Sequence, residues 1–595
     1  MNSKINYRLK KADDAKESQK GVLGTALRRL LPLMAQERGS VIIALVAIAI
    51  SSASTLIAPA IIAHTVDSYI QNKNFDGVLQ FSGLLLLVYI FGAIASYVQV
   101  RTMGGVGRRV LFNLRNTIFN KLQSLPVAFF NQNKAGDLIS RINNDTDKLN
   151  QFFAQALMQF ISNFVLIAGA GVFLLVINIK LGAAALVPAL IVLVLTQLLS
   201  PWVKRANLAS LRSLGGMSGE IQESLNNFKV IVAFNRLDYF RDKFKESNRI
   251  NYAASIKAGV ANNTFTPIYT LASTVAQLIV LSYGIYLIST GDFTLGLLIG
   301  FILYVNNFYF PLRQLAAVWS SLQQALAGLD RISEVLALES DMPVMLEIGE
   351  KPLSNDFILS FDHVSFGYPD ADTDVLHDIT FALEKGKTYA LVGPTGGGKT
   401  TTASLMARLY DPTKGTVYLA GHDIRSYTPE ERSKKIGFIL QEPFLFSGTV
   451  RENILYGNDE YKDHTNEEVA ALLERANLTA LLSRFSEGLE TKVKSSGDAV
   501  SLGQKQLIAF MRAALRSPDI LILDEATANV DTVTEQLLED ILKKLPKHTT
   551  RVIIAHRLNT IENADEIFFV NGGEVIQAGT MEHAVDMLLH GKRQS

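Results

Sequence analysis

The chain contains no cysteine, and this absence removes two classes of structure from consideration. Disulfide bonds and thiolate metal sites cannot form, and the redox compartment of the protein stays undecided. The net charge is only +1, so the composition does not indicate nucleic acid as a partner. The first residues also lack the pattern of a secretory signal, in which a short charged start precedes an apolar core and a small-residue cleavage site. We therefore expect the N-terminus to be retained and cytoplasmic.

The 595 residues exceed the size at which a single hydrophobic core stops growing, so at least two domains are expected. Long apolar runs fill the first half, whereas the part after Asp330 has the mixed composition of a soluble α/β domain. Near the start, leucines at helical spacing beside arginines predict an amphipathic helix on a membrane surface; they are Leu23, Leu27, Leu30 and Leu31, with Met34. We expect a tail with this helix (1–40), a six-helix transmembrane domain with intracellular loops (41–330), a linker (331–355) and a soluble domain (356–595).

The apolar windows from Val41 onward are each about 20 residues long, enough to cross a bilayer as a helix. Two of them, Val41 to Ala63 and Leu181 to Leu199, hold almost no charge, which favours membrane crossings over buried soluble helices. We expect six crossings, near residues 41–66, 78–101, 155–177, 181–203, 264–289 and 294–318. An even number of crossings leaves both ends of the chain on one side of the membrane.

Basic residues indicate which side that is. The links near 67–77, 178–180 and 290–293 contribute only Lys73 and Lys180, while most other Lys and Arg near the crossings lie on the opposite side. Because basic residues are enriched in cytoplasmic loops, we expect the termini and the soluble domain to be cytoplasmic. Charged side chains are nearly absent inside the crossings, which argues against ion-coupled transport.

Two features of the membrane half are open to more than one interpretation. The connections near 102–154 and 204–263 keep helical periodicity, and the turn-like patches 129–137 and 212–217 within them are either plain turns or contact points for the soluble domain. The last crossing holds a polar and aromatic cluster that either lines a substrate cavity or packs between helices. It consists of Tyr304, Asn306, Asn307, Phe308, Tyr309 and Phe310, just before Pro311.

A phosphate-binding loop follows the apolar run Tyr389 to Val392 in the soluble half. Its residues match G-x-x-x-x-G-K-[ST] between a predicted strand and a predicted helix. In such a loop the backbone N–H groups surround the phosphates, the lysine reaches the β- and γ-phosphates, and the hydroxyl after it holds Mg²⁺. We therefore predict a nucleotide site built from Gly393, Pro394, Thr395, Gly396, Gly397, Gly398, Lys399, Thr400 and Thr401.

Two carboxylates complete the predicted site, at the end of the apolar strand Ile520 to Leu523. Asp524 is predicted to hold Mg²⁺, directly or through water, and Glu525 to polarise the attacking water as a general base. Acidic residues at the end of a strand are common. Their combination with a phosphate loop is what indicates ATP and Mg²⁺ as cofactors.

With these motifs in this order, the chain resembles a half-transporter of the ATP-binding cassette (ABC) exporter family, in which six membrane helices precede one nucleotide-binding domain, here 356–595. Tyr368 resembles the aromatic residue that stacks on adenine, and Gln441 the Q-loop glutamine, which implies a catalytic and Mg²⁺-binding role. Asp531 resembles the D-loop aspartate, and His556 the switch histidine that contacts the γ-phosphate. The two turn-like patches resemble the family's coupling helices.

One motif departs from the family pattern. The signature Leu-Ser-Gly-Gly-Gln is replaced by Val500 followed by Ser501, Leu502, Gly503 and Gln504. In the family this signature completes the ATP site of the opposite subunit, so Leu502 puts that function in doubt. A branched side chain obstructs the close approach to phosphate that glycine permits. We therefore expect a heterodimer with one competent and one impaired ATP site; a homodimer is the alternative.

The resemblance implies ATP-driven export of a hydrophobic or amphipathic substrate by alternating access in a dimer of half-transporters. It implies a multi-pass protein of a bacterial plasma membrane, with a second half-transporter, lipid and a small amphipathic substrate as partners. A lipid flippase and a regulatory ATP-binding subunit with low turnover are the alternatives. The sequence has no metal-ligand cluster and no preceding peptidase domain. It therefore gives no support to metal export or to peptide processing.

Overall fold

The computed structural model describes residues 6–9, 31–345, 356–371, 373–494, 500–524, 532–554, 562–579 and 581–590. The chain divides into two compact units. The membrane unit covers Lys10–Leu122 and Gly136–Ala337, and the soluble unit covers Met1–Leu9, Gln123–Ala135 and Leu338–Ser595. The described part of the predicted amphipathic helix is the short 3-10 helix η2 (Leu31–Glu37); the rest of that prediction lies outside the described residues.

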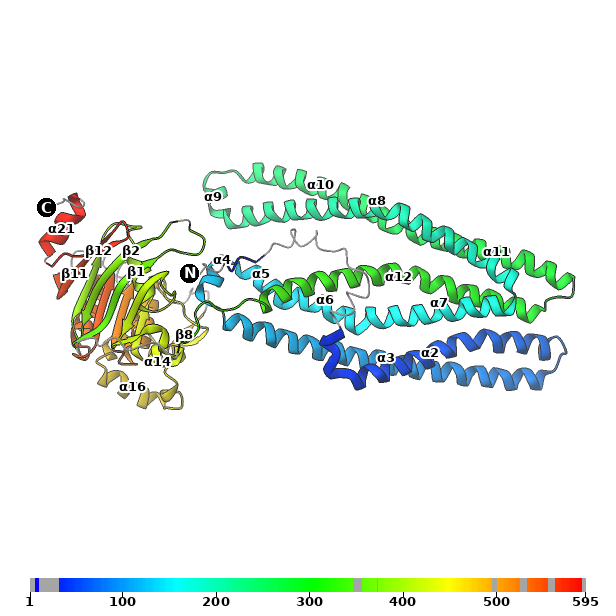
Figure 1. Cartoon of the computed structure of the whole chain (residues 1–595), viewed down its shortest axis with the longest axis horizontal. Helices are drawn as coiled ribbons and strands as arrows, with labels where there is room; N and C mark the ends of the chain where they lie inside the picture. The colour runs from blue at the N-terminus through cyan, green and yellow to red at the C-terminus, as the bar shows by residue number, and fades with distance from the viewer. Residues whose placement is uncertain are drawn as a thin grey trace. The chain divides into compact units, whose positions relative to one another are not determined.

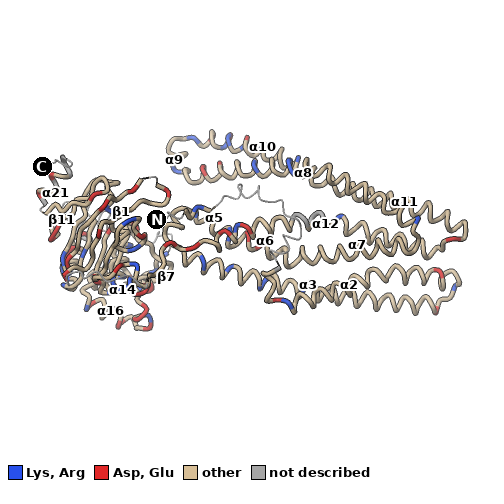
Figure 2. Tube along the Cα trace, viewed as in Figure 1, with Lys and Arg blue, Asp and Glu red and all other residues tan. Residues whose placement is uncertain are grey.

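The membrane unit contains six helices long and apolar enough to span a bilayer, in the part of the chain that the structure describes (Figure 1), which confirms the six predicted crossings. The helices that carry them are α2 (Arg38–Thr65), α3 (Phe75–Gln123), α7 (Leu157–Ile177), α8 (Ile179–Asn226), α11 (Phe265–Ser289) and α12 (Leu295–Leu336). Figure 2 shows long stretches of α2, α3, α7 and α11 without Lys, Arg, Asp or Glu. Their apolar composition makes a membrane the solvent in which these helices are stable.

Several helices continue well past the length of a crossing, as expected. Helix α3 has 49 residues and α8 has 48, against the ~20 needed to span the hydrocarbon core. Helix α12 continues to Leu336, beyond the boundary expected at residue 330. Shorter elements connect the long ones: α4 (Val127–Gln132), α5 (Ala135–Ser140), α6 (Thr146–Gln151), α9 (Phe228–Ala233), α10 (Leu237–Asn263) and the π-helical segments η3 (Val66–Ile70), η4 (Arg141–Asp145) and η5 (Phe152–Ala156).

The second predicted turn was wrong. Residues 212–217 lie inside the continuous helix α8, although each of the two glycines there costs about 1 kcal/mol relative to alanine. Helix α8 runs beside α10 and bonds to it, for example through Ser213 Oγ and Asn251 Oδ1, and this pairing outweighs the cost. The chain turns instead around α9, between Asn227 and Asn235; Asn235 has a φ of 51°, a left-handed conformation that asparagine tolerates.

The core of the membrane unit forms where α2, α7, α8, α11 and α12 pack together. Small residues such as Ala170, Ala185 and Ala276 are buried there and let the helix backbones approach closely. The predicted polar and aromatic cluster serves both of the roles considered for it, because some members pack between helices and others line a cavity. Tyr304 and Tyr309 are buried, and their hydroxyls donate to the carbonyl oxygens of Leu56 and Ala185, so these two rings serve packing.

An ion-pair network around the buried Arg141 joins η4 to the last turns of α12 within the membrane unit. Arg141 is only 1% exposed and donates to Asp137 (3.0 Å), to Glu334 (2.7 Å) and to the carbonyl oxygen of Arg331 (2.6 Å). Arg331 in turn donates to Asp137 at 2.6 Å. Each charge in this network has a partner of opposite sign, which is the condition under which buried charges are tolerated.

In its described residues the soluble unit has three sheets. A six-stranded sheet has the order β12-β11-β3-β10-β9-β6 and is parallel except for β12, which confirms the expected parallel sheet. An antiparallel four-stranded sheet (β2-β1-β4-β5) and a two-stranded one (β7-β8) accompany it. The strands are β1 (Phe357–Phe366), β2 (Leu376–Glu384), β3 (Thr388–Val392), β4 (Lys414–Leu419), β5 (His422–Asp423), β6 (Ile436–Ile439), β7 (Gly448–Thr449), β8 (Lys492–Val493), β9 (Ile520–Asp524), β10 (Thr550–Ile554), β11 (Glu566–Asn571) and β12 (Glu574–Gln577).

Helices of the soluble unit connect these strands. Most are short, and the longest described ones, α18 and α19, have 13 residues each. They are α13 (Lys399–Met406), α14 (Pro429–Lys435), α15 (Val450–Leu455), α16 (Asn466–Arg475), α17 (Thr479–Leu482), α18 (Leu502–Ala514), α19 (Thr532–Lys544) and α21 (Met581–His590), with the 3-10 turns η6 (Ile424–Ser426), η7 (Asp459–Tyr461) and η8 (Gly488–Glu490).

The N-terminal residues 6–9 belong to the soluble unit and pack on α4. Tyr7 is fully buried: its backbone N–H donates to Gln132, its carbonyl oxygen accepts from Asn133, and its hydroxyl accepts from the N–H of Asp341 at 2.8 Å. Its ring meets Phe129 edge to face. Tyr7 thereby joins α4 to the chain that follows α12.

Candidate functional site

The predicted phosphate loop lies between β3 and α13, as its sequence requires. The backbone of the loop has φ angles that require glycine. Gly393 has a φ of 147° and Gly398 one of 113°, in the region that residues with a side chain rarely adopt. A Cβ on Gly393 would also lie 2.0 Å from the carbonyl oxygen of Val570. Only glycine fits this close approach, so the loop conformation depends on these residues.

Lys399 begins α13 and folds back over the loop. Its ammonium group is buried and donates to the carbonyl oxygens of Gly393 (2.8 Å) and Pro394 (3.0 Å). These bonds hold the lysine at the loop. A bound phosphate would compete with the two carbonyl oxygens for the ammonium group of Lys399. Thr400, the predicted Mg²⁺ ligand, is exposed.

Asp524 ends β9 at the same edge of the sheet as the phosphate loop. In the strand register Asp524 lies opposite Ile554 in β10, and Ile554 lies opposite Leu391 in β3, two residues before Gly393. Asp524 is 4% exposed. The carboxylate of Asp524, the hydroxyl of Thr400 and the side-chain amide oxygen of Gln441 are hard oxygen donors, the kind that Mg²⁺ takes.

Three predicted residues lie outside the described residues: Glu525, Asp531 and His556. In the sequence Glu525 directly follows β9, and His556 comes soon after the end of β10. Their roles therefore stay predictions from the sequence.

Gln441 follows β6, the strand that pairs with β9. It is exposed, and its carbonyl oxygen accepts a long hydrogen bond of 3.5 Å from Gln506, which is buried in α18. The predicted Q-loop is thus connected to the helix that begins at the signature residues.

Tyr368, the predicted adenine-stacking residue, lies beside the phosphate-loop helix. Its hydroxyl is 3.1 Å from Thr401 Oγ1, and its ring meets Tyr410 edge to face at 5.3 Å between centroids. Burial raises the pKa of Tyr410 above its ordinary value. The Tyr410 hydroxyl accepts a hydrogen bond of 2.6 Å from Asn131 in α4.

This bond concerns the first turn-like patch, for which the sequence left open a plain turn or a contact with the soluble domain. Helix α4 belongs to that patch and to the soluble unit, so the contact is present. A continuous set of contacts therefore joins the phosphate-loop helix to α4 through Thr401, Tyr368, Tyr410 and Asn131. Asn131 lies in the patch that the sequence offered as a possible contact point, but its partner Tyr410 was not predicted, because nothing in the local sequence of Tyr410 distinguishes it.

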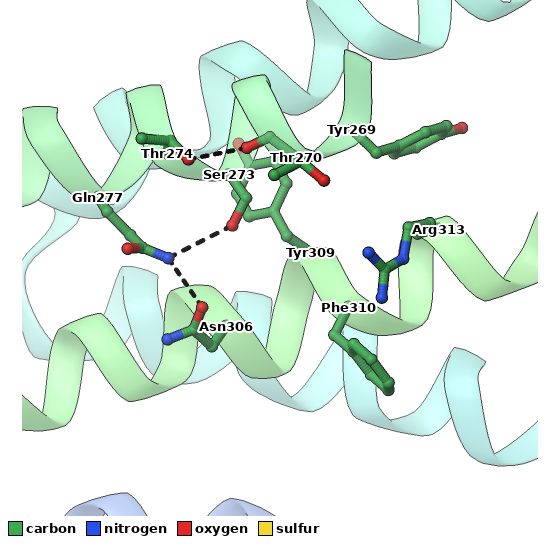
Figure 3. Close-up of a pocket in the computed structure, with 9 residues that line it drawn as sticks. All are labelled: Tyr269, Thr270, Ser273, Thr274, Gln277, Asn306, Tyr309, Phe310 and Arg313. Atoms are coloured by element: carbon green, nitrogen blue, oxygen red, sulfur yellow. Dashed lines mark hydrogen bonds between the residues drawn. The ribbon is translucent and has the colours of Figure 1, made fainter. Parts of the chain in front are cut away.

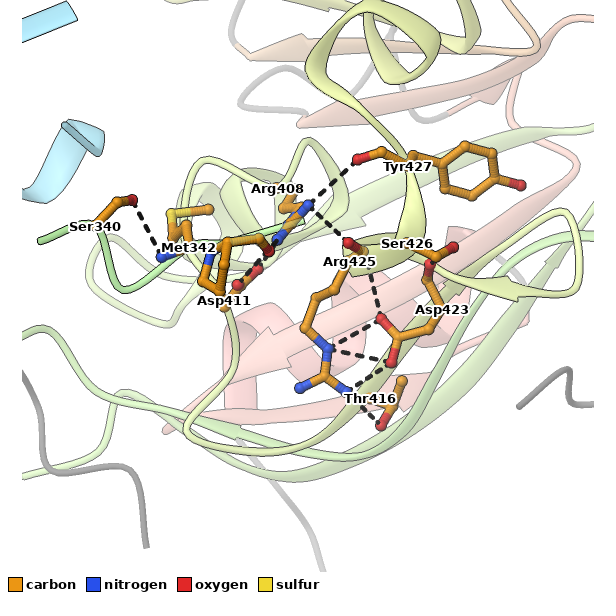
Figure 4. Close-up of polar contacts among 10 residues, drawn as sticks. Ser340, Met342, Arg408, Asp411, Thr416, Asp423, Arg425, Ser426 and Tyr427 are labelled. Atoms are coloured by element: carbon orange, nitrogen blue, oxygen red, sulfur yellow. Dashed lines mark hydrogen bonds and ion pairs between the residues drawn. The ribbon is translucent and has the colours of Figure 1, made fainter. Parts of the chain in front are cut away.

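The segment after α13 is also bonded to the chain that follows α12. Arg408 is 3% exposed and donates to Asp411 and to the carbonyl oxygen of Pro343 at 2.8 Å. Figure 4 shows its guanidinium group reaching the carbonyl oxygens of Arg425 and Tyr427 as well. The five N–H donors of one arginine thus fasten this connection to the soluble unit.

The signature residues form the start of α18. Ser501 is the N-cap, and its hydroxyl oxygen accepts from the N–H of Gln504 while the side chain of Gln504 accepts from the N–H of Ser501. The next N–H groups, of Leu502 and Gly503, have no intrahelical partner at a helix start and are suited to binding an anion. The side chain of Leu502 is half-buried, so the departure from glycine does not prevent the helix start from forming.

A cavity of about 240 Å³ lies between α11 and α12 in the membrane unit (Figure 3). Asn306, Tyr309 and Phe310 of the predicted cluster line it. The sequence analysis did not predict the other lining residues, which are Tyr269, Thr270, Ser273, Thr274, Gln277 and Arg313. Four of them, from Thr270 to Gln277, recur at helical spacing in α11, and that period is the signal that could have revealed them.

Comparison with known families identifies both halves of the chain. Residues 41–312 match the ABC transporter transmembrane region, and residues 376–528 match the ABC transporter family. The chain is 32% identical over 563 residues to an uncharacterized ABC transporter ATP-binding protein of Bacillus subtilis, covering 94% of this chain and 92% of the relative.

Two further relatives carry functional names. A multidrug resistance ABC transporter ATP-binding and permease protein of Lactococcus lactis is 32% identical over 496 residues, with 83% of each chain covered. A fatty acid ABC transporter ATP-binding/permease protein of Mycobacterium bovis is 31% identical over 510 residues, covering 86% of this chain and 80% of the relative.

Proposed function

Because this chain belongs to the ABC transporter family and is a multi-pass membrane protein, we propose that it hydrolyses ATP to export a hydrophobic or amphipathic substrate. The family match covers the phosphate loop, so the soluble unit binds ATP. Export, alternating access in a dimer, and the place of the protein in a bacterial plasma membrane with a cytoplasmic ATPase are our proposals. The exporter relatives, the bacterial origin of the relatives named above and the distribution of basic residues support them.

In the proposed reaction, Mg²⁺ held at this site would neutralise charge on the phosphates. Lys399 and the loop N–H groups bind the phosphates, while Thr400, Asp524 and Gln441 provide the oxygen donors for the metal. Glu525 acts as general base on the attacking water, and His556 contacts the γ-phosphate. Tyr368 stacks on adenine, and Asp531 takes part in the dimer contact through the D-loop.

One observation carries the coupling of hydrolysis to transport. Asn131 in α4 bonds to Tyr410, whose ring contacts Tyr368 beside Thr401 of the phosphate-loop helix. Helix α4 lies between the crossings α3 and α7 in the sequence. A rearrangement at Tyr368 when adenine binds would therefore shift α4. Through α4 the same movement would reach the helices that cross the membrane.

We further propose that the working assembly is a heterodimer. In the family, half-transporters pair, and each signature completes the ATP site of the partner. Leu502 weakens that contribution, while Lys399 and Asp524 keep this chain's own half of the site complete. A partner with an intact signature would resolve this mismatch, because it completes the site that this chain's phosphate loop begins.

The test is ATP-dependent uptake of fluorescent amphipathic dyes into inverted membrane vesicles that contain the tagged chain, with Lys399→Ala as the matched control. Dye accumulation that needs ATP and is lost in Lys399→Ala supports export. Stimulation of the ATPase in nanodiscs by lipids but not by dyes would favour a flippase. ATP binding without turnover, under any substrate and with the partner half-transporter present in the same vesicles, would contradict the proposal in favour of a regulatory subunit.

A further inference from the structure

The cavity between α11 and α12 has two chemically different ends (Figure 3). At one end Gln277 donates to Asn306 Oδ1 at 2.8 Å, forming an amide pair between the two helices. At the other end Arg313 directs its guanidinium group into the cavity, beside Phe310. Hydroxyls of Thr270, Ser273 and Thr274 lie along the α11 side.

The polar stripe on α11 indicates that this face does not contact lipid tails. Thr270 and Thr274 satisfy their own hydroxyl protons by donating to carbonyl oxygens one turn earlier, so their oxygens can still accept. Polar groups in membrane helices face the protein interior or a water-filled cavity, because lipid offers them no hydrogen bonds. The stripe, together with Gln277 and Asn306, therefore lines a polar compartment within the crossings.

Arg313 gives this compartment a positive charge. Of the described residues that line the cavity, Arg313 alone is charged, and none is a carboxylate. Its guanidinium lies 5.2 Å from the centroid of the Phe310 ring, and within the described part of the chain it forms no ion pair. Guanidinium remains charged at any physiological pH, and its planar fork matches a carboxylate or a phosphate.

The depth of Arg313 in the membrane also suits a lipid-like anion. Arg313 follows the start of α12 at Leu295 by about five turns, or roughly 27 Å at about 1.5 Å per residue. The hydrocarbon core is about 30 Å thick, so Arg313 lies near the end of the crossing opposite to the short link that precedes α12. With the predicted orientation, this is the level of the headgroups of the cytoplasmic leaflet.

We propose that this cavity binds the anionic headgroup of the transported substrate, an amphiphile with a carboxylate or phosphate group, through Arg313. The exposed ring of Phe310 contacts the first part of its apolar chain, and the buried rings of Tyr269 and Tyr309 form the wall of the cavity. The proposal rests on the export function proposed above and names its substrate class. It also explains why a membrane crossing carries an arginine whose ion-pair partner the described chain does not supply.

The experiment measures binding without ATP, so it does not depend on turnover. The full-length transporter in nanodiscs of neutral phosphatidylcholine is titrated with dodecanoate and dodecyl phosphate, and with dodecyltrimethylammonium as the cationic counterpart. Arg313→Gln keeps hydrogen-bonding groups but removes the charge, and Arg313→Lys restores the charge. Arg101→Gln, an exposed arginine at the expected end of the second crossing, is the matched control.

We expect Arg313→Gln to raise the Kd of both anions by about 10- to 100-fold, the range for loss of one charge-assisted contact. Arg313→Lys should retain most of the affinity, Arg101→Gln should match the unmodified chain, and binding of the cation should not weaken in Arg313→Gln. Unmodified protein that binds neither anion more tightly than the cation, or equal anion binding in Arg313→Gln, would overturn the proposal. If anions bind through Arg313 but no ATP-dependent transport occurs, the site stands while the export function fails. Transport of cationic dyes alone would support export and overturn the site.

Discussion

Replacement of Leu502 by glycine tests the heterodimer at the residue that suggested it. Leu502 is the first residue of α18, directly after the N-cap Ser501, and its side chain is half-buried. The change restores the glycine of the family signature and removes the branched side chain beside the N–H groups at the helix start. It leaves the capping bonds between Ser501 and Gln504 in place.

The expected magnitude follows from two opposing effects. Losing one preorganised donor to a developing charge commonly costs 10²- to 10³-fold in rate, so a homodimer that regains it should gain about that factor. Glycine at a helical position costs about 1 kcal/mol relative to alanine, which slightly weakens the start of α18. Leu502→Ala removes most of the side chain without this cost and separates the two effects.

The assay is the ATPase rate of the tagged chain purified without any partner, in nanodiscs, for the unmodified protein, Leu502→Gly and Leu502→Ala. A heterodimer subunit should be nearly inactive alone, and neither variant should change its rate by more than a few fold. A gain of two orders of magnitude in Leu502→Gly would refute the reasoning, and so would robust substrate-stimulated turnover of the unmodified chain alone.

Other changes test other parts of the structure. Lys399→Ala should weaken ATP binding and turnover together, because the ammonium group is the cationic contact to the phosphates; unchanged ATPase in that variant rules out the assigned site. Glu525→Gln should still bind ATP but lose at least about 10²-fold in turnover, and loss of nucleotide binding would make Glu525 structural instead. Tyr410→Phe removes the acceptor of the 2.6 Å bond from α4, so substrate stimulation of the ATPase should fall while basal turnover persists; equal loss of both contradicts the coupling role. Arg141→Met removes the buried guanidinium that bonds Asp137, Glu334 and the carbonyl oxygen of Arg331, and should destabilise the membrane unit by about 1–3 kcal/mol, seen as a lower unfolding temperature in detergent, whereas Arg241→Met, which removes one partner of an exposed ion pair, should change it little.

Local sequence was sufficient for the features that depend on neighbours along the chain. A membrane crossing requires about 20 apolar residues in succession, and the structure contains the six predicted crossings in its described part. The phosphate loop likewise combines short-range requirements, since glycines such as Gly393 and Gly398 are needed for backbone angles within the loop itself. The carboxylate Asp524 was predictable because it ends an apolar strand, and strand ends meet at one edge of a parallel sheet.

Contacts between distant parts of the chain were decided only by the tertiary structure. Asn131 and Tyr410 are separated by 279 positions, and no local pattern pairs them. The glycines at 215 and 216 predicted a turn, but pairing of α8 with α10 keeps them helical and moves the turn to α9. Arg313 is one more basic residue in the sequence, and it gains a distinct environment only where α11 supplies the facing polar stripe. Helix packing brings together side chains that are far apart in the sequence. Burial stabilises two complementary surfaces regardless of how many residues separate them along the chain.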